Sequence, residues 1–359
     1  MKRLTLLERI GPPDEAAGRE AQRRLDALTK PPGSLGRLEE LAHALCRMSG
    51  RCPPPTAHAV IFTLAADHGV AAEGVSAYPQ VVTAQMVENF LSAGAAVNVL
   101  ARQARARVVV ADFGVAAPLG DRAGLARCPL GPGTASFTRG PAMSRDQAIR
   151  AVEAGMDLVE AARGAGGLDL IGTGEMGIGN TTAASAMVAA LVGAPPAEVT
   201  GRGTGVDEAG WRRKVAVVER AIAVNWPDGR AEPRDGLEVL ARVGGFEIAG
   251  LAGVILAGAA HRIPVLLDGF IAGAAALAAV RMAPLARHYL IAAHRSAEPG
   301  HRHVLEALGL TPYLDLGMRL GEGTGAALVI PLARAAAALF TEMATFKSAG
   351  VSGAREAEP

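Results

Sequence analysis

The chain has 359 residues, of which 50% are hydrophobic and 20% are charged, and its formal net charge is +1. This balance, with no run of basic residues, argues against a nucleic-acid-binding protein, which would have a basic patch or stripe. The length and the apolar content suffice for one large domain, or two unequal ones, with a sizeable core.

The sequence favours neither a secreted protein nor a membrane protein. The N-terminus (MKRLTLLERIGPPDEAAG) has two early cations but no apolar segment of signal-peptide length. The richest apolar stretches, 250–260 and 270–280, are too short to span a bilayer. Cys46, Cys52 and Cys128 are odd in number and lack CxxC spacing, so we expect free thiols in a reducing compartment. These features are typical of a cytoplasmic α/β enzyme.

Near-continuous apolar runs recur along the chain, and segments of helical length separate them. Apolarity without alternation is typical of parallel strands that are covered on both faces. We expect strands at 59–64, 107–111, 168–171, 263–267 and 289–292. We expect helices at 83–102, 145–162, 247–262 and 325–344. The repeated order of strand, helix and strand predicts an α/β fold with a doubly wound parallel sheet.

Both chain ends have helical patterns and contain no convincing strand. We expect residues 1–30 together with 305–359 to form a small helical domain. We expect residues 31–304 to form the large α/β domain that carries the sheet.

Polar and glycine-rich segments follow the expected strands. They are AADHG (65–69), DFG (112–114), GTGEMGIGN (172–180), DGF (268–270) and AHRSAEPGH (293–301). Loops after strands are commonly polar in any α/β protein, but ligands also bind beyond the carboxyl ends of parallel strands. Five such segments therefore favour one shared crevice.

Gly172, Gly174 and Gly177 match the GxGxxG pattern of dinucleotide-binding turns. Glu175, however, places a carboxylate where a pyrophosphate would lie, and the acidic residue expected about 20 residues later is missing. A nicotinamide-dependent dehydrogenase is therefore an alternative and not the preferred interpretation.

Three further loops, GPGT (131–134), GRGTG (201–205) and GEGTG (321–325), expose backbone N–H groups that suit a phosphate monoester. Ordinary turns and helix caps look the same, so the hypothesis depends on there being several. Glycine loops without catalysis would also suit a nucleotide-binding regulatory module, which stays a second alternative.

The sequence predicts neither a standard NTPase nor a metal site. There is no GxxxxGK[ST] loop and no DD pair after an apolar run. The histidines at 294, 301 and 303 lie near Glu298, but without the spacing of metal ligands.

Glu322 is the carboxylate that the sequence singles out, because it lies between two glycines before an apolar helix. Burial would raise its pKa and suit it to general-base catalysis, whereas a position at the helix N-terminus would lower the pKa. A glutamate that only caps the helix is the other interpretation.

Together these segments resemble the nicotinate-nucleotide–dimethylbenzimidazole phosphoribosyltransferase family. The similar segments run in family order through nearly the whole chain, and GEMGIGNTT and MRLGEGTGAAL are the most specific. They are KPPGSLGRLE (30–39), ADHGVAAEGVSAYPQVVTAQMVENFL (66–91), GPAMSRDQA (140–148), GTGEMGIGNTTAASA (172–186), GRGTGVD (201–207), VGGFEIAG (243–250), VLLDGFI (265–271), HRSAEPGH (294–301) and MRLGEGTGAAL (318–328).

The resemblance implies transfer of the phosphoribosyl group of nicotinate mononucleotide to 5,6-dimethylbenzimidazole or a related base. The products would be α-ribazole 5′-phosphate, a precursor of the lower ligand of cobalamin, and nicotinate. It also implies a Rossmann-like sheet with a smaller domain from both chain ends, a homodimer, and no cofactor. A monophosphate donor needs no magnesium clamp, in agreement with the missing DD pair.

The resemblance assigns residues as well. Glu322 matches the general base of the family. Tyr78, Pro79, Met86 and Leu320 match the side that binds the benzimidazole. The side that binds the ribose phosphate and nicotinate matches Glu175, Met176, Gly177, Gly203, Thr204, Gly205 and Lys214.

Overall fold

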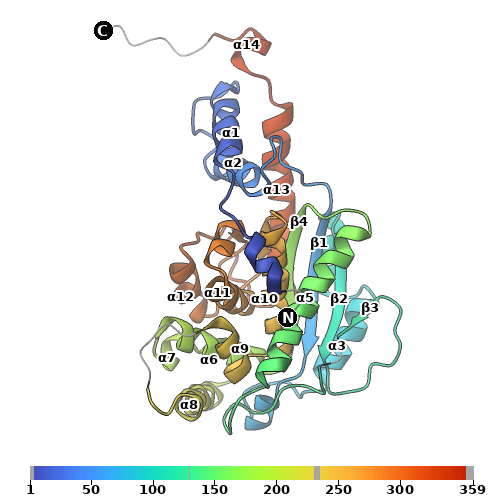
Figure 1. Cartoon of the computed structure of the whole chain (residues 1–359), viewed down its shortest axis with the longest axis vertical. Coiled ribbons are helices and arrows are strands. Elements are labelled where there is room, and N and C mark those ends of the chain that lie inside the picture. Colours follow the sequence, from blue (N-terminus) through green and yellow to red (C-terminus); the bar gives the residue numbers. More distant parts are fainter. Residues whose placement is uncertain (1–3, 129, 230–234, 353–359) are drawn as a thin grey trace.

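In a computed structural model of the chain, residues 4–128, 130–229 and 235–352 are described. Within them six parallel strands form one sheet in the order β3–β2–β1–β4–β5–β6, with helices on both faces (Figure 1). The order 3-2-1-4-5-6 is that of a doubly wound dinucleotide-type sheet and confirms the predicted fold class. The strands are β1 (Ala59–Ala66), β2 (Arg107–Gly114), β3 (Leu125–Arg127), β4 (Leu170–Met176), β5 (Val265–Leu267) and β6 (Leu290–Ala292).

Helices connect the strands and extend both chain ends. The longer α-helices are α1 (Glu15–Ala27), α2 (Arg37–Ser49), α3 (Val82–Leu91), α4 (Ala96–Gln103), α5 (Arg145–Gly164), α6 (Asn180–Val192), α8 (Glu208–Asn225), α9 (Gly236–Val243), α10 (Phe246–Ala260), α11 (Phe270–Met282), α12 (Gly300–Leu308) and α13 (Thr324–Glu342). Short turns of helix are η1 (Leu4–Arg9), η2 (Gly69–Glu73), α7 (Pro196–Val199), η3 (Pro284–Tyr289) and α14 (Phe346–Ala349).

All five predicted strands are present, and β1, β2 and β4 run further towards the site than predicted. Strand β3 was not expected, because three partly exposed residues carry too weak a pattern. The single helix expected at 83–102 is two helices, α3 and α4, because Ala93 takes a left-handed conformation with φ of 59° between them.

The core depends on close packing of small residues. Every residue of α10 is buried, and this helix lies against α5. A Cβ atom on Gly253 would lie 1.9 Å from the carbonyl oxygen of Val152, and one on Gly155 would lie 1.9 Å from that of Gly250. The abundant glycine and alanine therefore bring helix backbones into contact.

The two chain ends pack together away from the sheet (Figure 1). Arg24 of α1 donates hydrogen bonds to the carbonyl groups of Phe340 and Met343 at the end of α13. Helix α2 packs on both α1 and α13, although it lies beyond the predicted boundary at residue 30. A small helical domain from both ends stays a prediction, and α2 would enlarge it.

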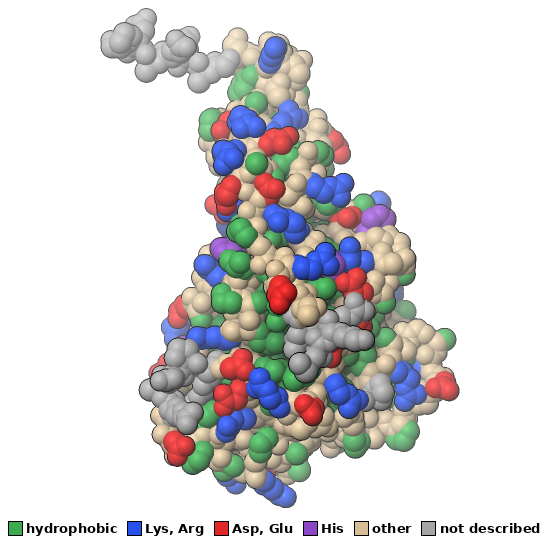
Figure 2. All heavy atoms as spheres, in the orientation of Figure 1, with side chains coloured by type: hydrophobic (Ala, Val, Ile, Leu, Met, Phe, Trp, Pro, Cys, Tyr) green, Lys and Arg blue, Asp and Glu red, His purple; other side chains and the backbone are tan. Residues whose placement is uncertain are grey.

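Helix α13 is, among the described residues, long and apolar enough to cross a membrane by length and composition alone. However, 56% of its apolar window is buried inside the protein, where it packs on β4 and α2. The core helix of a globular domain has the same properties. On the face in Figure 2, acidic and basic side chains are interspersed, as the balanced net charge leads one to expect.

Candidate active site

The candidate site lies where the strand order reverses, between β1 and β4. Residues 321–323, immediately before α13, reach the sheet at this position. Thr63 of β1 donates a hydrogen bond of 2.9 Å to the carbonyl oxygen of Glu322. A Cβ atom on Gly174 of β4 would lie 2.2 Å from the same oxygen. The loop therefore reaches the sheet only because residue 174 has no side chain.

This contact explains the GxGxxG pattern and corrects its interpretation as a turn. Gly172 and Gly174 lie inside β4. A Cβ atom on Gly172 would lie 2.9 Å from the Cγ1 atom of Ile61 and 3.2 Å from the Cβ atom of Ala326. Both glycines thus serve the packing of α13 on the sheet. A pyrophosphate turn requires them to follow the strand, so the dehydrogenase alternative loses its main support.

Glu322 has an unusual backbone and a buried side chain. It is 5% exposed, and its φ of 64° lies between Gly321 at 88° and Gly323 at 99°. A non-glycine residue in the left-handed region costs about 1–2 kcal/mol, and such strain concentrates at functional sites. Burial raises the pKa of Glu322 above its ordinary value, and the N–H of Val97, 3.5 Å from Oε2, lowers it in part.

Asp268, and not Glu322, holds the N-terminus of α13. Its carboxylate accepts hydrogen bonds from the N–H groups of Gly323 (3.1 Å), Gly325 (2.6 Å) and Ala326 (3.4 Å). Burial raises the pKa of Asp268 to about 7, although these three donors lower it. The interpretation of Glu322 as the cap of its own helix, α13, is therefore wrong. Its carboxylate instead faces the first turn of α4, through the N–H of Val97.

Glu175 lies beside the same loop. It is 5% exposed, and a Cβ atom on Gly321 would lie 2.2 Å from its Oε1 atom. Asn180 donates a short hydrogen bond to Oε2. Burial, followed by the charges of Asp268 and Glu247, raises the pKa of Glu175 well above its ordinary value. Two carboxyl groups with raised pKa values thus belong to the site: Glu175, whose Oε1 atom lies beside Gly321, and Glu322, the next residue in the chain.

The GRGTG loop lies next to a buried cation. Lys214 of α8 is 1% exposed, and its Nζ atom donates to Oγ1 of Thr181 at 3.0 Å. Burial lowers the pKa of Lys214 to about 8. A Cβ atom on Gly203 would lie 2.7 Å from this Nζ atom, so the loop passes directly over the ammonium group.

Neighbouring groups already engage part of this loop. The N–H of Gly203 donates to Oε1 of Glu298 at 3.0 Å, and the N–H of Gly205 donates to the carbonyl group of Arg202. Arg319, three residues before Glu322, donates to the carbonyl group of Gly203 at 2.8 Å. The cation at Lys214 is therefore a stronger anchor for an anion than the loop N–H groups that the sequence suggested.

The segment expected to bind the base is tied to the same loop. Oγ1 of Thr204 accepts a hydrogen bond of 3.0 Å from the N–H of Ala77. The next two residues, Tyr78 (55% exposed) and Pro79, are exposed, and Met86 of α3 is partly buried. Leu320, at 58% exposed, is near Glu322 in sequence. These apolar side chains are accessible to a flat ligand.

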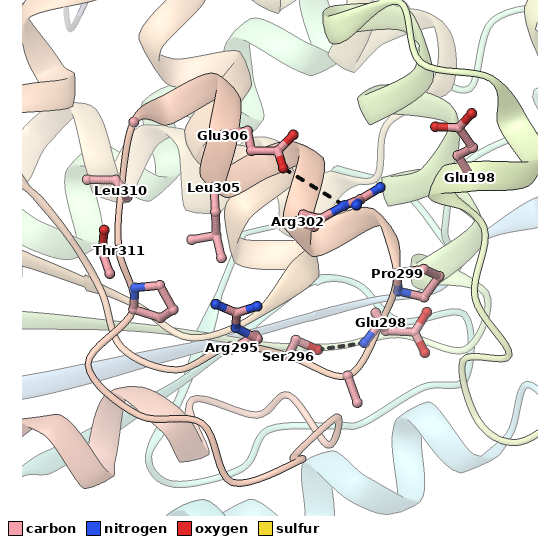
Figure 3. A pocket seen from close by; sticks show the side chains of 13 residues that line it. Glu198, Arg295, Ser296, Glu298, Pro299, Arg302, Leu305, Glu306, Leu310 and Thr311 are labelled. Atoms are coloured by element: carbon pink, nitrogen blue, oxygen red, sulfur yellow. Dashed lines mark hydrogen bonds and ion pairs between the residues drawn. The ribbon is translucent and has the colours of Figure 1, made fainter.

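Two hollows lie on the Lys214 side of the site. One, of about 610 Å³, is lined by Gly201, Arg202, Glu208, Trp211, Ala297, Glu298, Pro299 and Arg319. The other, also of about 610 Å³, has Arg295 and Ser296 on one wall and Arg302 and Glu306 of α12 on another (Figure 3). Both share residues 297–299, and neither is lined by Glu322.

Sequence reasoning missed several residues of the site: Thr63, Thr181, Asp268, Glu298 and Arg319. It also missed a buried pair, His68 and Glu247, whose Nε2 and Oε1 atoms are 2.5 Å apart below Gly177. The only available signal was position, because His68, Asp268 and Glu298 all belong to the polar segments that follow strands.

No metal site is recognisable in the part of the chain that the structure describes, where no three His, Cys, Asp or Glu side chains are grouped to hold an ion. The carboxylates of the site instead accept hydrogen bonds from N–H groups. Independence of metal stays a prediction.

Comparison with known proteins identifies the family. The phosphoribosyltransferase family model matches residues 10–351. The chain is 58% identical over 347 residues to the nicotinate-nucleotide–dimethylbenzimidazole phosphoribosyltransferase of a Roseiflexus species, covering 97% of each chain. It is 56% identical over 351 residues to the enzyme of that name from Chloroflexus aggregans, covering 98% of each.

Solved structures agree with the sequence relatives. A crystal structure of nicotinate-nucleotide–dimethylbenzimidazole phosphoribosyltransferase from Thermus thermophilus superimposes with a TM-score of 0.89 at 49% identity, covering 95% of this chain and 100% of that one. The chain therefore belongs to the nicotinate-nucleotide–dimethylbenzimidazole phosphoribosyltransferase family.

Proposed function

We propose that this enzyme transfers the 5-phosphoribosyl group of nicotinate mononucleotide to 5,6-dimethylbenzimidazole or a related base. The products are α-ribazole 5′-phosphate, for the lower ligand of cobalamin, and nicotinate. The observation that carries the proposal is the buried carboxylate of Glu322, which does not cap its own helix, α13, and lies at the switch point of the sheet. Family membership supplies the substrates.

The reaction is a single displacement with inversion, from the β linkage of the donor to the α linkage of the product. The lone-pair nitrogen of the benzimidazole attacks C1′, and the bond from C1′ to the pyridinium nitrogen breaks. Its electron pair neutralises the pyridinium, so nicotinate leaves without a proton from the enzyme. The attacking ring becomes positively charged, and the carboxylate of Glu322 takes the proton from its other nitrogen. The same negative charge stabilises an oxocarbenium-like transition state.

The remaining residues divide into two sides. Tyr78, Pro79, Met86 and Leu320 bind the flat base by stacking, apolar and sulfur contacts. Lys214 pairs with the donor phosphate, because its buried ammonium group lies directly under the glycine loop and is suited to a dianion. The ribose and nicotinate lie along the rest of that side, which consists of Glu175, Met176, Gly177, Gly203, Thr204 and Gly205.

We also expect a homodimer in the cytoplasm. Leu316, 61% exposed and six residues before Glu322 in the sequence, is a large apolar side chain that a second copy would cover. Cys46, Cys52 and Cys128 are free thiols, in keeping with a reducing compartment. Light scattering at micromolar concentration tests the dimer, and a monomer there would contradict it.

The test of function is nicotinate release from the mononucleotide with and without added benzimidazole. We expect release only with the base, and one product whose glycosidic bond is α by NMR. Release without the base, or a β product, would exclude single displacement. Binding of the mononucleotide without turnover would favour a regulatory module.

A further inference from the structure

The peptide group that joins Glu322 to Gly323 is held at both of its polar atoms by buried side chains of the sheet. Its carbonyl oxygen accepts from Oγ1 of Thr63 at 2.9 Å, and its N–H donates to Oδ2 of Asp268 at 3.1 Å. Thr63 lies on β1 and Asp268 directly follows β5, on the two sides of β4. The plane of this one peptide is therefore fixed from two directions.

The orientation of this peptide decides where the carboxylate points. Residues 321–323 are all left-handed, and the turn that they form is closed by the N–H (3.1 Å) and the hydroxyl group (2.8 Å) of Thr324, which donate to the carbonyl oxygen of Gly321. These bonds do not involve the polar atoms of the Glu322–Gly323 peptide, which Thr63 and Asp268 hold instead. Rotating the peptide plane changes ψ of Glu322 and moves its Cβ atom relative to the sheet. A general base acts only within hydrogen-bond reach of the proton that it accepts, so a small displacement is costly.

Thr63 is placed for this task and has no other visible one. It is 0% exposed in the middle of β1, between Val110 of β2 and Gly174 of β4. Side chains two residues apart on a strand share a face, and Ile61 on this face packs under Gly323. A valine would fill the same space in such an apolar strand. The hydroxyl group contributes only the hydrogen bond to Glu322.

We propose that Thr63 is a positioning residue, whose hydroxyl group orients the catalytic carboxylate of Glu322 through the backbone carbonyl of that residue. Thr63 touches neither substrate, and it acts only through Glu322. The inference rests on the proposed function of Glu322 as the general base.

The test compares Thr63→Val, which keeps the shape and removes the hydroxyl, with Thr63→Ser, which keeps the hydroxyl. We expect Thr63→Val to lower kcat about 10-fold to 100-fold with donor KM within about twofold, because misplacement by about 1 Å can cost 100-fold. Thr63→Ser should retain most of kcat. Thr182→Val is the matched control, since Thr182 is also 0% exposed and its hydroxyl group has no hydrogen-bond partner among the residues that the structure describes.

A double-mutant cycle separates positioning from general stability. In a Glu322→Gln background, Thr63→Val should have little further effect on kcat, because the base through which it acts is gone. Equal losses of kcat in both backgrounds would overturn the proposal. So would a Thr63→Val enzyme with the kcat of the wild type, or a Thr63→Ser enzyme as slow as Thr63→Val. If Thr63→Val does not fold, Thr63→Ala makes the same comparisons.

Failure of the proposed function would look different. If wild-type protein releases no nicotinate with a benzimidazole, or if Glu322→Gln alone keeps full kcat, the assignment of Glu322 fails whatever Thr63 does. If Glu322→Gln is slow and Thr63→Val is not, only the positioning role fails.

Discussion

Gly174 and Glu322 are in direct backbone contact, because a Cβ atom on Gly174 would lie 2.2 Å from the carbonyl oxygen of Glu322. A strand glycine thus makes room for the loop that carries the candidate base. The strand order reverses at this point, so the contact joins the architecture of the sheet to the chemistry of the site.

Replacing this glycine should damage catalysis more than binding. We expect Gly174→Ala to displace the 321–323 loop, lower kcat at least about 100-fold, and cost about 1–3 kcal/mol of stability through overpacking. Gly164→Ala is the matched control, because a Cβ atom there meets nothing within 4 Å. Steady-state kinetics and thermal melts of both variants test this prediction. A fully active Gly174→Ala enzyme would show that catalysis does not depend on the position of the 321–323 loop.

Lys214 should govern the affinity for the donor. Lys214→Met keeps most of the buried stem and removes the charge, so donor KM should rise about 10-fold or more while base KM changes little. The control is Lys347→Met, at an exposed position on α14. An unchanged donor KM would remove Lys214 from the phosphate side.

The low pKa of Lys214 also predicts a pH dependence. The folded pKa of about 8 lies below the ordinary 10.5, so the ammonium group loses its proton as pH rises through about 8. Donor kcat/KM, which reports on the free enzyme, should therefore fall above pH 8. This decline should be absent in Lys214→Met. Between pH 8 and 10.5 the folded state therefore binds fewer protons at Lys214 than the unfolded state does. The cost of burying this group lowers the free energy of unfolding fully below pH 8, and this cost disappears as the pH rises to 10.5.

Tyr78 should contribute to binding of the base. Contacts of an aromatic ring with a flat ligand are worth roughly 0.5–1.5 kcal/mol, so Tyr78→Ala should raise base KM about tenfold at most and leave donor KM unchanged. Leu285→Ala, at another exposed apolar side chain, is the control. A rise in donor KM instead would mean that this segment binds the other substrate.

Turnover should not depend on a divalent metal. Treatment with EDTA should leave kcat within about twofold of the untreated enzyme, because the pyridinium is already a good leaving group and the donor carries a monophosphate, which needs no metal to hold it. Activity that is lost with EDTA and restored by magnesium would refute this.

The fold was predictable because it depends on local patterns, whereas much of the site was not. Apolar runs marked the buried strands, and the polar segments after them marked the edge where Glu175 and Glu322 lie. Contacts between distant residues left no local signal. Thr63 looks like an ordinary residue of an apolar strand, and its partner lies 259 residues away. Asp268 holds a helix whose start is 55 residues further along the chain, so its neighbours could not reveal a capping role.

The GxGxxG pattern is a clear local signal, but its interpretation from the sequence was wrong. Its spacing suggested a turn around a pyrophosphate, but only the structure shows that Gly172 and Gly174 are strand residues under α13. The spacing of these glycines indicates that another group comes close to the backbone, but it does not distinguish a bound pyrophosphate from a neighbouring segment of the chain.

The kcat of Glu322→Gln tests the account most directly. Glutamine keeps the shape but cannot accept the proton, so we expect kcat to fall roughly 10²–10⁴-fold with little change in donor KM or melting temperature. In the wild type, kcat should fall as pH drops through the raised pKa of Glu322, since the base must be ionised. Glu342→Gln, at the other, exposed end of α13, should behave like the wild type. A stable Glu322→Gln enzyme with the kcat of the wild type would contradict the account, and the role of general base would then pass to Glu175.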